Sequence, residues 1–123
     1  MVLVLMIFMH LVDDYKLQGI LSNLKQKDWW EENYPDALYK KDYIVALLEH
    51  AFMNSVMVHI PIYFFLCKDR FALFITFFTI FISHAFIDNI KANLKICNLF
   101  TDQLLHILII ILTYILYLRL NLL

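Results

Sequence analysis

Long apolar stretches alternate with short polar links along this chain. Each apolar stretch is close to the roughly 20 residues that a helix needs to cross about 30 Å of hydrocarbon. The links between the later stretches, "CKDR" and "ANLKICNLF", are short, so consecutive helices should be antiparallel neighbours. The pattern predicts an all-α fold, a four-helix up-down transmembrane bundle forming a single integral membrane domain over residues 1–123. The expected transmembrane helices are 2–24, 43–67, 71–91 and 101–122.

The link between the first two stretches has a different composition. Residues 25–42, "KQKDWWEENYPDALYKKD", combine many charges with two tryptophans and two tyrosines. Such amphipathic rings collect where the headgroups of a bilayer meet water. We therefore expect an interfacial, amphipathic and aromatic segment between the first and second transmembrane helices.

The overall composition supports the bilayer as the solvent of this chain. Hydrophobic residues make up 63% of its 123 residues, against roughly 45–50% in soluble globular domains. The net charge of -1 comes without a basic patch or stripe, which argues against nucleic acid as a partner.

Cys67 and Cys97 have no metal-binding spacing, and we expect both to be small buried hydrophobic residues that form no disulfide. The opening "MVLVLMIFM" has no basic region before it and is expected to be a retained helix, not a signal peptide.

The distribution of Lys and Arg predicts the orientation, because these residues favour cytoplasmic loops. One side of the expected bundle holds the 25–42 and 92–100 links, and the other side holds the "CKDR" turn and the termini. The first side carries Lys16, Lys25, Lys27, Lys40, Lys41, Lys91 and Lys95, and the second carries Lys68, Arg70 and Arg119. We therefore expect both longer links in the cytoplasm and both termini outside.

Seven ionisable residues fall at one depth of this expected bundle, toward the cytoplasmic leaflet. Three pairs have a four-residue spacing, which places both members on one face of a helix, about 6 Å apart along its axis. Ionisable groups inside a membrane are costly and usually face a partner or a functional cavity. The seven residues are His10, Asp14, His50, His84, Asp88, Asp102 and His106.

Imidazole and carboxylate groups from several helices are a ligand set for divalent transition metals. We expect one or two ions, with zinc first and manganese, iron or nickel as alternatives. The alternative is a hydrogen-bonded polar cluster without metal, in which Asp14 and Asp88 pair with Lys16, Lys25 or Lys91. That alternative suits any one of these histidines, whereas the common depth of all seven groups favours metal.

Several neighbouring polar residues have weaker signals. Gln18, Asn54 and Gln103 lie close to the seven residues in sequence and are expected to orient the metal ligands; Gln103 could instead cap the fourth helix. His59 is nine residues past His50, on the opposite helix face and roughly 13 Å deeper, so it is excluded. By their helical position, Asp13 and Glu49 are expected to form salt bridges or face solvent.

Taken together, these motifs resemble the domain-of-unknown-function 3307 family, which consists of small membrane proteins of bacteria and phages. The resemblance rests on "HLVDDYKLQ", Lys25, His50, "HAFIDNIK" and "FTDQLLH". A more distant similarity is to membrane-bound metal-dependent hydrolases, and a bacterial inner (plasma) membrane is implied as the location. The long spacer "GILSNLKQKDWWEENYPD" departs from the family pattern. The implied functional set is His10, Asp14, Gln18, Lys25, His50, His84, Asp88, Lys91, Asp102, Gln103 and His106.

Three functions fit these features. The first is a metal-dependent hydrolase acting on a lipid or a lipid-linked phosphate or ester. In that enzyme Asp14 and Asp88 would serve as ligands or as a general base, and Lys25 and Lys91 would hold a phosphate. The second is a non-enzymatic metal-binding or transport protein. The third is a phage or host accessory protein that acts through protein contacts, with the aromatic segment as its surface. The lipid bilayer is the expected partner, and a homo-oligomer is left open.

Overall fold

The computed structural model describes residues 1–66 and 69–122, and every regular element in this part of the chain is helical. The all-α fold class is therefore confirmed. Two π-helical turns, η1 and η3, and one 3-10 turn, η2, extend or connect the α-helices. The elements are α1 (Val2–Val12), η1 (Asp13–Leu17), α2 (Leu21–Leu24), α3 (Lys27–Asn33), η2 (Ala37–Tyr39), α4 (Asp42–Leu66), α5 (Arg70–Asn89), η3 (Ile90–Leu94) and α6 (Leu99–Leu120).

Three helical stretches are long and apolar enough to cross a membrane. They run over Ala37–Leu66, Arg70–Leu94 and Leu99–Leu120, close to three of the expected spans. Their outer faces carry exposed phenylalanine and leucine side chains, such as Phe74 and Leu108. An apolar surface of this extent is costly in water and suits hydrocarbon, so the fold indicates a membrane protein.

The expected continuous helix over 2–24 is wrong. The α-helix ends at Val12, continues as the π-helical turn η1 and breaks at Gly19, whose φ is +50°. L-amino acids with a side chain disfavour this left-handed conformation, so glycine allows the chain to turn here. The short helix α2 then starts at Leu21. As a result, α1 is only 11 residues long and packs against α4 and α6.

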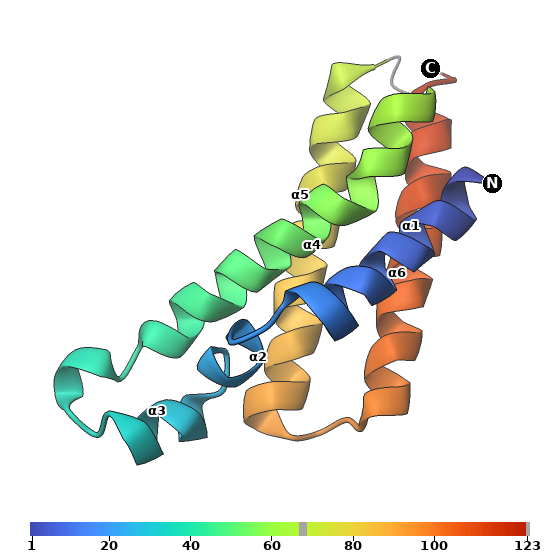
Figure 1. Ribbon diagram of the computed structural model, residues 1–123. Coiled ribbons are helices and arrows are strands. Elements are labelled where there is room, and N and C mark those ends of the chain that lie inside the picture. The colour runs from blue at the N-terminus through green and yellow to red at the C-terminus, as the bar shows by residue number, and fades with distance from the viewer. Residues whose placement is uncertain (67–68, 123) are drawn as a thin grey trace.

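The long helices form an arrangement in which sequence neighbours pack side by side (Figure 1). Helix α4 runs from the end that holds α2 and α3 toward the end near the chain termini, and α5 returns antiparallel to it. Helix α6 follows α5 after a short link at the α2 and α3 end. One end of the molecule therefore carries both longer links, while the termini lie toward the other end.

Local capping sets where the later helices begin. The Asn98 side chain accepts a hydrogen bond from the Thr101 backbone N–H, so α6 starts at Leu99, two residues before the expected start. In the same way, Asp69 caps α5 by accepting from the Phe71 N–H. Side-chain oxygens at this position satisfy backbone donors that have no partner inside the helix.

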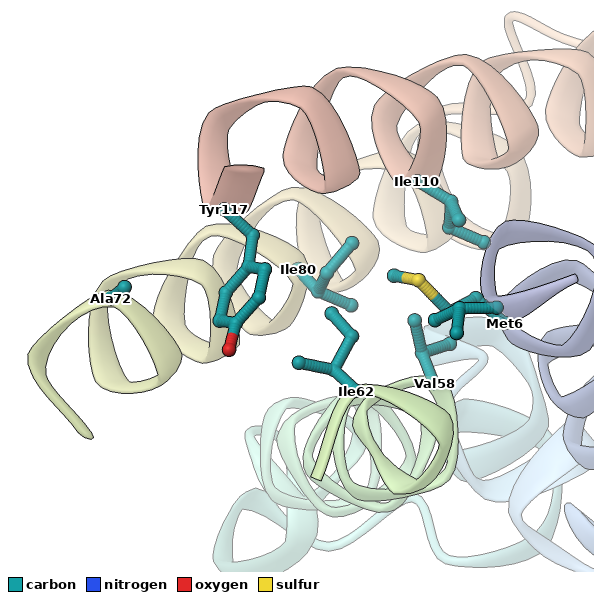
Figure 2. Packing of buried hydrophobic residues seen from close by; sticks show 8 residues of the cluster. Met6, Val58, Ile62, Ala72, Ile80, Ile110 and Tyr117 are labelled. Carbon is teal, nitrogen blue, oxygen red and sulfur yellow. The ribbon is translucent and has the colours of Figure 1, made fainter. Parts of the chain in front are cut away.

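The half of the bundle near the termini has an apolar core (Figure 2). Side chains from α1, α4, α5 and α6 point toward one another there, and the Tyr117 hydroxyl donates to the backbone oxygen of Leu66 at 2.7 Å. Between helices in a bilayer, such side chains stabilise the fold mainly by van der Waals packing. Cys97 is half-buried, and Cys67 lies outside the described residues. The buried cluster consists of Val2, Met6, Val58, Ile62, Ala72, Ile80, Ile110 and Tyr117.

Candidate metal centre

The seven ionisable residues singled out above lie together in the other half of the bundle. They come from α1, η1, α4, α5 and α6, and each is 7% exposed or less. Helical spacing explains the local part of this arrangement, because residues four apart share one face. The packing of α1, α4, α5 and α6 brings the separate faces together.

One group of donor atoms surrounds the imidazoles of α4 and α5. The Nε2 atoms of His50 and His84 lie 3.1 Å apart. Oδ1 of Asp14 is 3.2 Å from the first of these nitrogens and 3.6 Å from the second. Oδ2 of Asp88 is 3.4 Å and 3.7 Å from the same two nitrogens. Ligands bound at 2.0–2.1 Å to a tetrahedral zinc ion lie about 3.3 Å apart, so these spacings match a metal site.

A second group of donor atoms lies beside the first, toward α6. Nε2 of His106 is 3.2 Å from Oδ1 of Asp88 and 3.6 Å from Oδ1 of Asp102. The rings of His84 and His106 are 4.2 Å apart between centroids, so the two groups adjoin. His10 completes this side, with its Nε2 atom 3.7 Å from Oδ2 of Asp14.

Two lysines partly neutralise the buried carboxylates. The Lys25 amino group donates to Oδ2 of Asp88 at 2.5 Å, and the Lys91 amino group donates to Oδ2 of Asp102 at 2.8 Å. The pair of Lys25 with Asp88 was part of the metal-free alternative, whereas Lys91 was expected to pair with Asp14 or Asp88 and pairs with Asp102. Lys16, by contrast, is exposed.

Several nitrogen and oxygen atoms of the cluster have no hydrogen-bond partner among the described residues. Nε2 of His10, Oδ1 of Asp14 and Oδ1 of Asp102 are buried without a hydrogen-bond partner. The 3.2 Å approach of His50 to Asp14 lacks hydrogen-bond geometry. Buried polar atoms are rarely left unpaired, because each costs about 1–3 kcal/mol. A cation would satisfy these lone pairs, so the donor set could hold a metal ion.

Asp13 belongs to this cluster, although the sequence suggested a salt bridge or a solvent-exposed position outside the centre. Its side chain is 2% exposed and accepts a hydrogen bond from the Asn54 amide at 3.0 Å, while lying 3.8 Å from Nδ1 of His50. The cause is the π-helical turn η1, in which the Gln18 N–H donates to the Asp13 backbone oxygen five residues back. This wider turn changes the side-chain period and brings both Asp13 and Asp14 inward.

The residues expected to orient the ligands have specific contacts. The Asn54 amide lies 3.2–3.3 Å from Nδ1 of His10 on α1, although in sequence Asn54 follows His50 by four residues on α4. The Gln103 amide donates to Oδ2 of Asp14 at 2.9 Å, which connects α6 to η1. The Gln18 amide donates to the backbone oxygen of Asp14.

Glu49, expected to form a salt bridge or face solvent, and His59, which was excluded, both lie outside the centre. Glu49 is exposed. His59 is buried, but its ring lies 2.9 Å from the Ser55 backbone oxygen and 3.3 Å from the Thr76 hydroxyl. These contacts account for both of its nitrogens, so His59 provides a natural control for the histidines of the centre.

A cavity of about 350 Å³ adjoins the centre at the end that carries the links. Three lysines line it, and Asp88 contributes both to its wall and to the first donor group. The cavity therefore connects the cluster with an entrance lined by three lysines, each of which is paired with a carboxylate. Its lining consists of Gln18, Ser22, Lys25, Gln26, Asp88, Lys91, Ala92 and Lys95.

These features define a class of protein: a helical, membrane-type protein with a buried cluster of His and Asp residues. The sequence model of the family described as "Protein of unknown function (DUF3307)" matches residues 2–122, and the chain belongs to this family. The resemblance drawn from the motifs is thus confirmed. Neither the curated proteins nor the solved structures contain a match.

Proposed function

We propose that this protein is a membrane-embedded metal-dependent hydrolase that acts on a lipid or a lipid-linked phosphate or ester. The observation that carries the proposal is the position of Asp88. Its carboxylate lies within 3.4 Å of His50 in the buried cluster and also forms part of the wall of the lysine-lined cavity. A headgroup in that cavity would therefore be next to the metal ligands.

The proposed roles follow from the chemistry of each group. A divalent ion, zinc first, would act as a Lewis acid and lower the pKa of water. Asp14, Asp88 and Asp102 would serve as ligands of the ion or as a general base that accepts a proton from the attacking water. Lys25 and Lys91 lie on the cavity wall and provide positive charge for a phosphate.

The proposal includes a four-segment bundle in the bacterial plasma membrane. Helix α1 and turn η1 form a continuous helical stretch of about 24 Å, which is shorter than the roughly 30 Å hydrocarbon layer. In this arrangement they are a fourth segment whose polar end reaches the cytoplasmic leaflet. The 25–42 and 92–100 links then lie on the cytoplasmic side and both termini lie outside, in keeping with the two ends of the fold (Figure 1).

A second candidate function is metal binding without hydrolysis, and one observation favours it. All three cavity lysines are already paired with carboxylates, Lys25 with Asp88, Lys91 with Asp102 and Lys95 with Asp28. In this arrangement Lys25 and Lys91 balance the charge of the ligands, and none of the three lysines is free to bind a substrate. The metal centre would then serve to bind an ion or to stabilise the bundle.

Hydrolysis assays on the purified protein in lipid nanodiscs distinguish these functions. The protein is loaded with Zn²⁺ or Mn²⁺ and offered phospholipids and polyprenyl phosphates, with product release followed by mass spectrometry. The hydrolase proposal predicts turnover that a chelator abolishes, that His84→Gln removes and that His59→Gln retains. A metal-loaded protein that leaves every one of these lipids intact would support the second candidate instead.

A further inference from the structure

The two carboxylates at the middle of the cluster each face two different sets of imidazoles. Oδ2 of Asp88 lies 3.4 Å from Nε2 of His50 and 3.7 Å from Nε2 of His84, while its Oδ1 lies 3.2 Å from Nε2 of His106. The two oxygens of one carboxylate thus belong to the two donor groups. This is the position of a carboxylate that bridges two cations.

Asp14 has the same relationship from the opposite side of the cluster. Its Oδ1 lies 3.2 Å and 3.6 Å from Nε2 of His50 and His84. Its Oδ2 faces His10, at 3.7 Å, and accepts the hydrogen bond of Gln103. Asp14 and Asp88 come from η1 and α5, so two distant parts of the chain provide equivalent groups.

We propose that the centre binds two divalent metal ions bridged by Asp14 and Asp88. The first ion takes His50 and His84 as its own ligands, and the second takes His106 and Asp102, with His10 close to it. This inference rests on the metal binding in the proposed function and specifies the number of ions and their bridges. Each donor group contains a buried carboxylate oxygen without a hydrogen-bond partner, Oδ1 of Asp14 in the first and Oδ1 of Asp102 in the second. One ion in each group would bind these oxygens.

The two donor groups of the cluster adjoin, because the rings of His84 and His106 are 4.2 Å apart between centroids. Two-metal sites likewise hold their ions side by side. Asp14, Asp88 and Asp102 carry three negative charges, two of which pair with Lys25 and Lys91, so the binding of two divalent ions would displace these lysines. Asp13 is the fourth buried carboxylate and lies 3.8 Å from His50. Helical bundles provide two-metal sites with carboxylate and histidine ligands in the same manner.

Manganese titration tests the number of ions and their coupling in one experiment. The metal-stripped full chain in nanodiscs is titrated with Mn²⁺, and bound metal is measured by elemental analysis and by electron paramagnetic resonance. We expect two ions per chain and an exchange-coupled signal that isolated ions do not give. His106→Gln should retain one uncoupled ion, and His59→Gln should bind two coupled ions like the wild type.

The outcomes separate this inference from the proposal on which it rests. Saturation of the wild type at one ion, or two ions with only uncoupled signals, overturns the two-ion centre while leaving metal binding in place. A wild type that binds no Mn²⁺ and no Zn²⁺ overturns both proposals. Because the coupled signal is measured on the unaltered protein, a variant that fails to fold does not affect the test.

Discussion

The Nε2 atoms of His50 and His84 lie 3.1 Å apart, on the neighbouring antiparallel helices α4 and α5 (Figure 1). Two neutral imidazoles at this distance cannot both direct a proton at the other, so at least one nitrogen presents its lone pair. Oxygens of Asp14 and Asp88 approach the same two nitrogens. Lone pairs of at least three residues thus meet at one buried place, as they would around a cation.

Loss of Asp13 should weaken metal binding without removing a ligand. Asp13→Ala removes the acceptor for the Asn54 amide and the carboxylate beside Nδ1 of His50, so the ligand histidine loses an orienting partner. We expect a decrease of about 10–100-fold in metal affinity, measured by competition with a chromophoric chelator. Glu49→Gln, at the exposed position next to His50, should have wild-type affinity. Equal affinities for both variants would show that Asp13 does not act on the centre.

Removal of Lys25 should destabilise the metal-free protein more than the metal-loaded protein. The Lys25 amino group is 2.5 Å from Asp88, and both side chains are largely buried, so Lys25→Met should cost about 3 kcal/mol without metal. A bound cation replaces this positive charge and should reduce the loss. Thermal unfolding with chelator and with Zn²⁺ measures both values.

The matched control for this comparison is Lys27→Met. Lys27 pairs with Glu31 at 3.3 Å, and both side chains are about half exposed, so its loss should cost less than about 1 kcal/mol. The cost should be the same with and without metal. Similar losses for Lys25→Met in both states would contradict a cation next to Asp88.

Gly19 should resist replacement because of its backbone conformation. The φ of +50° is strained for residues with a side chain, although a Cβ atom would have room, the nearest atom being the Leu17 backbone oxygen at 3.8 Å. Gly19→Ala should lower the free energy of unfolding by about 1 kcal/mol, measured by thermal unfolding in nanodiscs. Gly19→Asn should cost less, because asparagine tolerates the left-handed region. If alanine were as stable as glycine, the chain would not need the break between η1 and α2.

The contact between α3 and the link after η3 should depend on pH. The hydrogen bond and positive charge of Lys95 hold the pKa of Asp28 below its ordinary value. A carboxyl with a lowered pKa in the folded state stabilises the contact above its ordinary pKa of about 3.9, and this contribution is lost as the pH falls through the folded-state value. Amide hydrogen exchange of residues 27–33 should therefore accelerate in acid.

The variant Asp28→Asn provides the control for this pH dependence. It lacks the titrating carboxyl, so its exchange rates in α3 should show no acid step from this pair, after correction for intrinsic exchange. The hydrogen bond from the Lys27 N–H to the Asn93 side chain still connects the two segments, so α3 should stay docked. An acid step of equal size in Asp28→Asn would assign the effect to another group.

The sequence predicts the regular helices well, because their apolar runs are long and their period is uniform. The structure has helices at Asp42–Leu66, Arg70–Asn89 and Leu99–Leu120, close to the expected 43–67, 71–91 and 101–122. The four-residue spacing of His84 and Asp88 depends only on this regular geometry. It therefore survives in the structure, which places both residues in the buried cluster.

The sequence-based predictions are wrong where the backbone geometry is irregular or where a residue's position depends on contacts between distant parts of the chain. A break at Gly19 and a π-helical turn before it interrupt the first helix, and a pattern based on 3.6 residues per turn contains neither. For the same reason the sequence missed the inward position of Asp13. Asn54 contacts His10 rather than His50, because its partner is set by the packing of α1 on α4 and not by spacing within one helix. The metal-binding role of the cluster stays a prediction.

X-ray absorption at the zinc edge is the most direct test of a metal centre in this cluster. The full chain, purified without a histidine tag and loaded with Zn²⁺ in nanodiscs, should show nitrogen and oxygen ligands at about 2.0–2.1 Å together with the outer-shell scattering of imidazole. The imidazole signal should weaken in the double variant His50→Gln/His84→Gln and persist in His59→Gln. Absence of bound zinc in the wild type, or an unchanged spectrum in the double variant, would contradict the account.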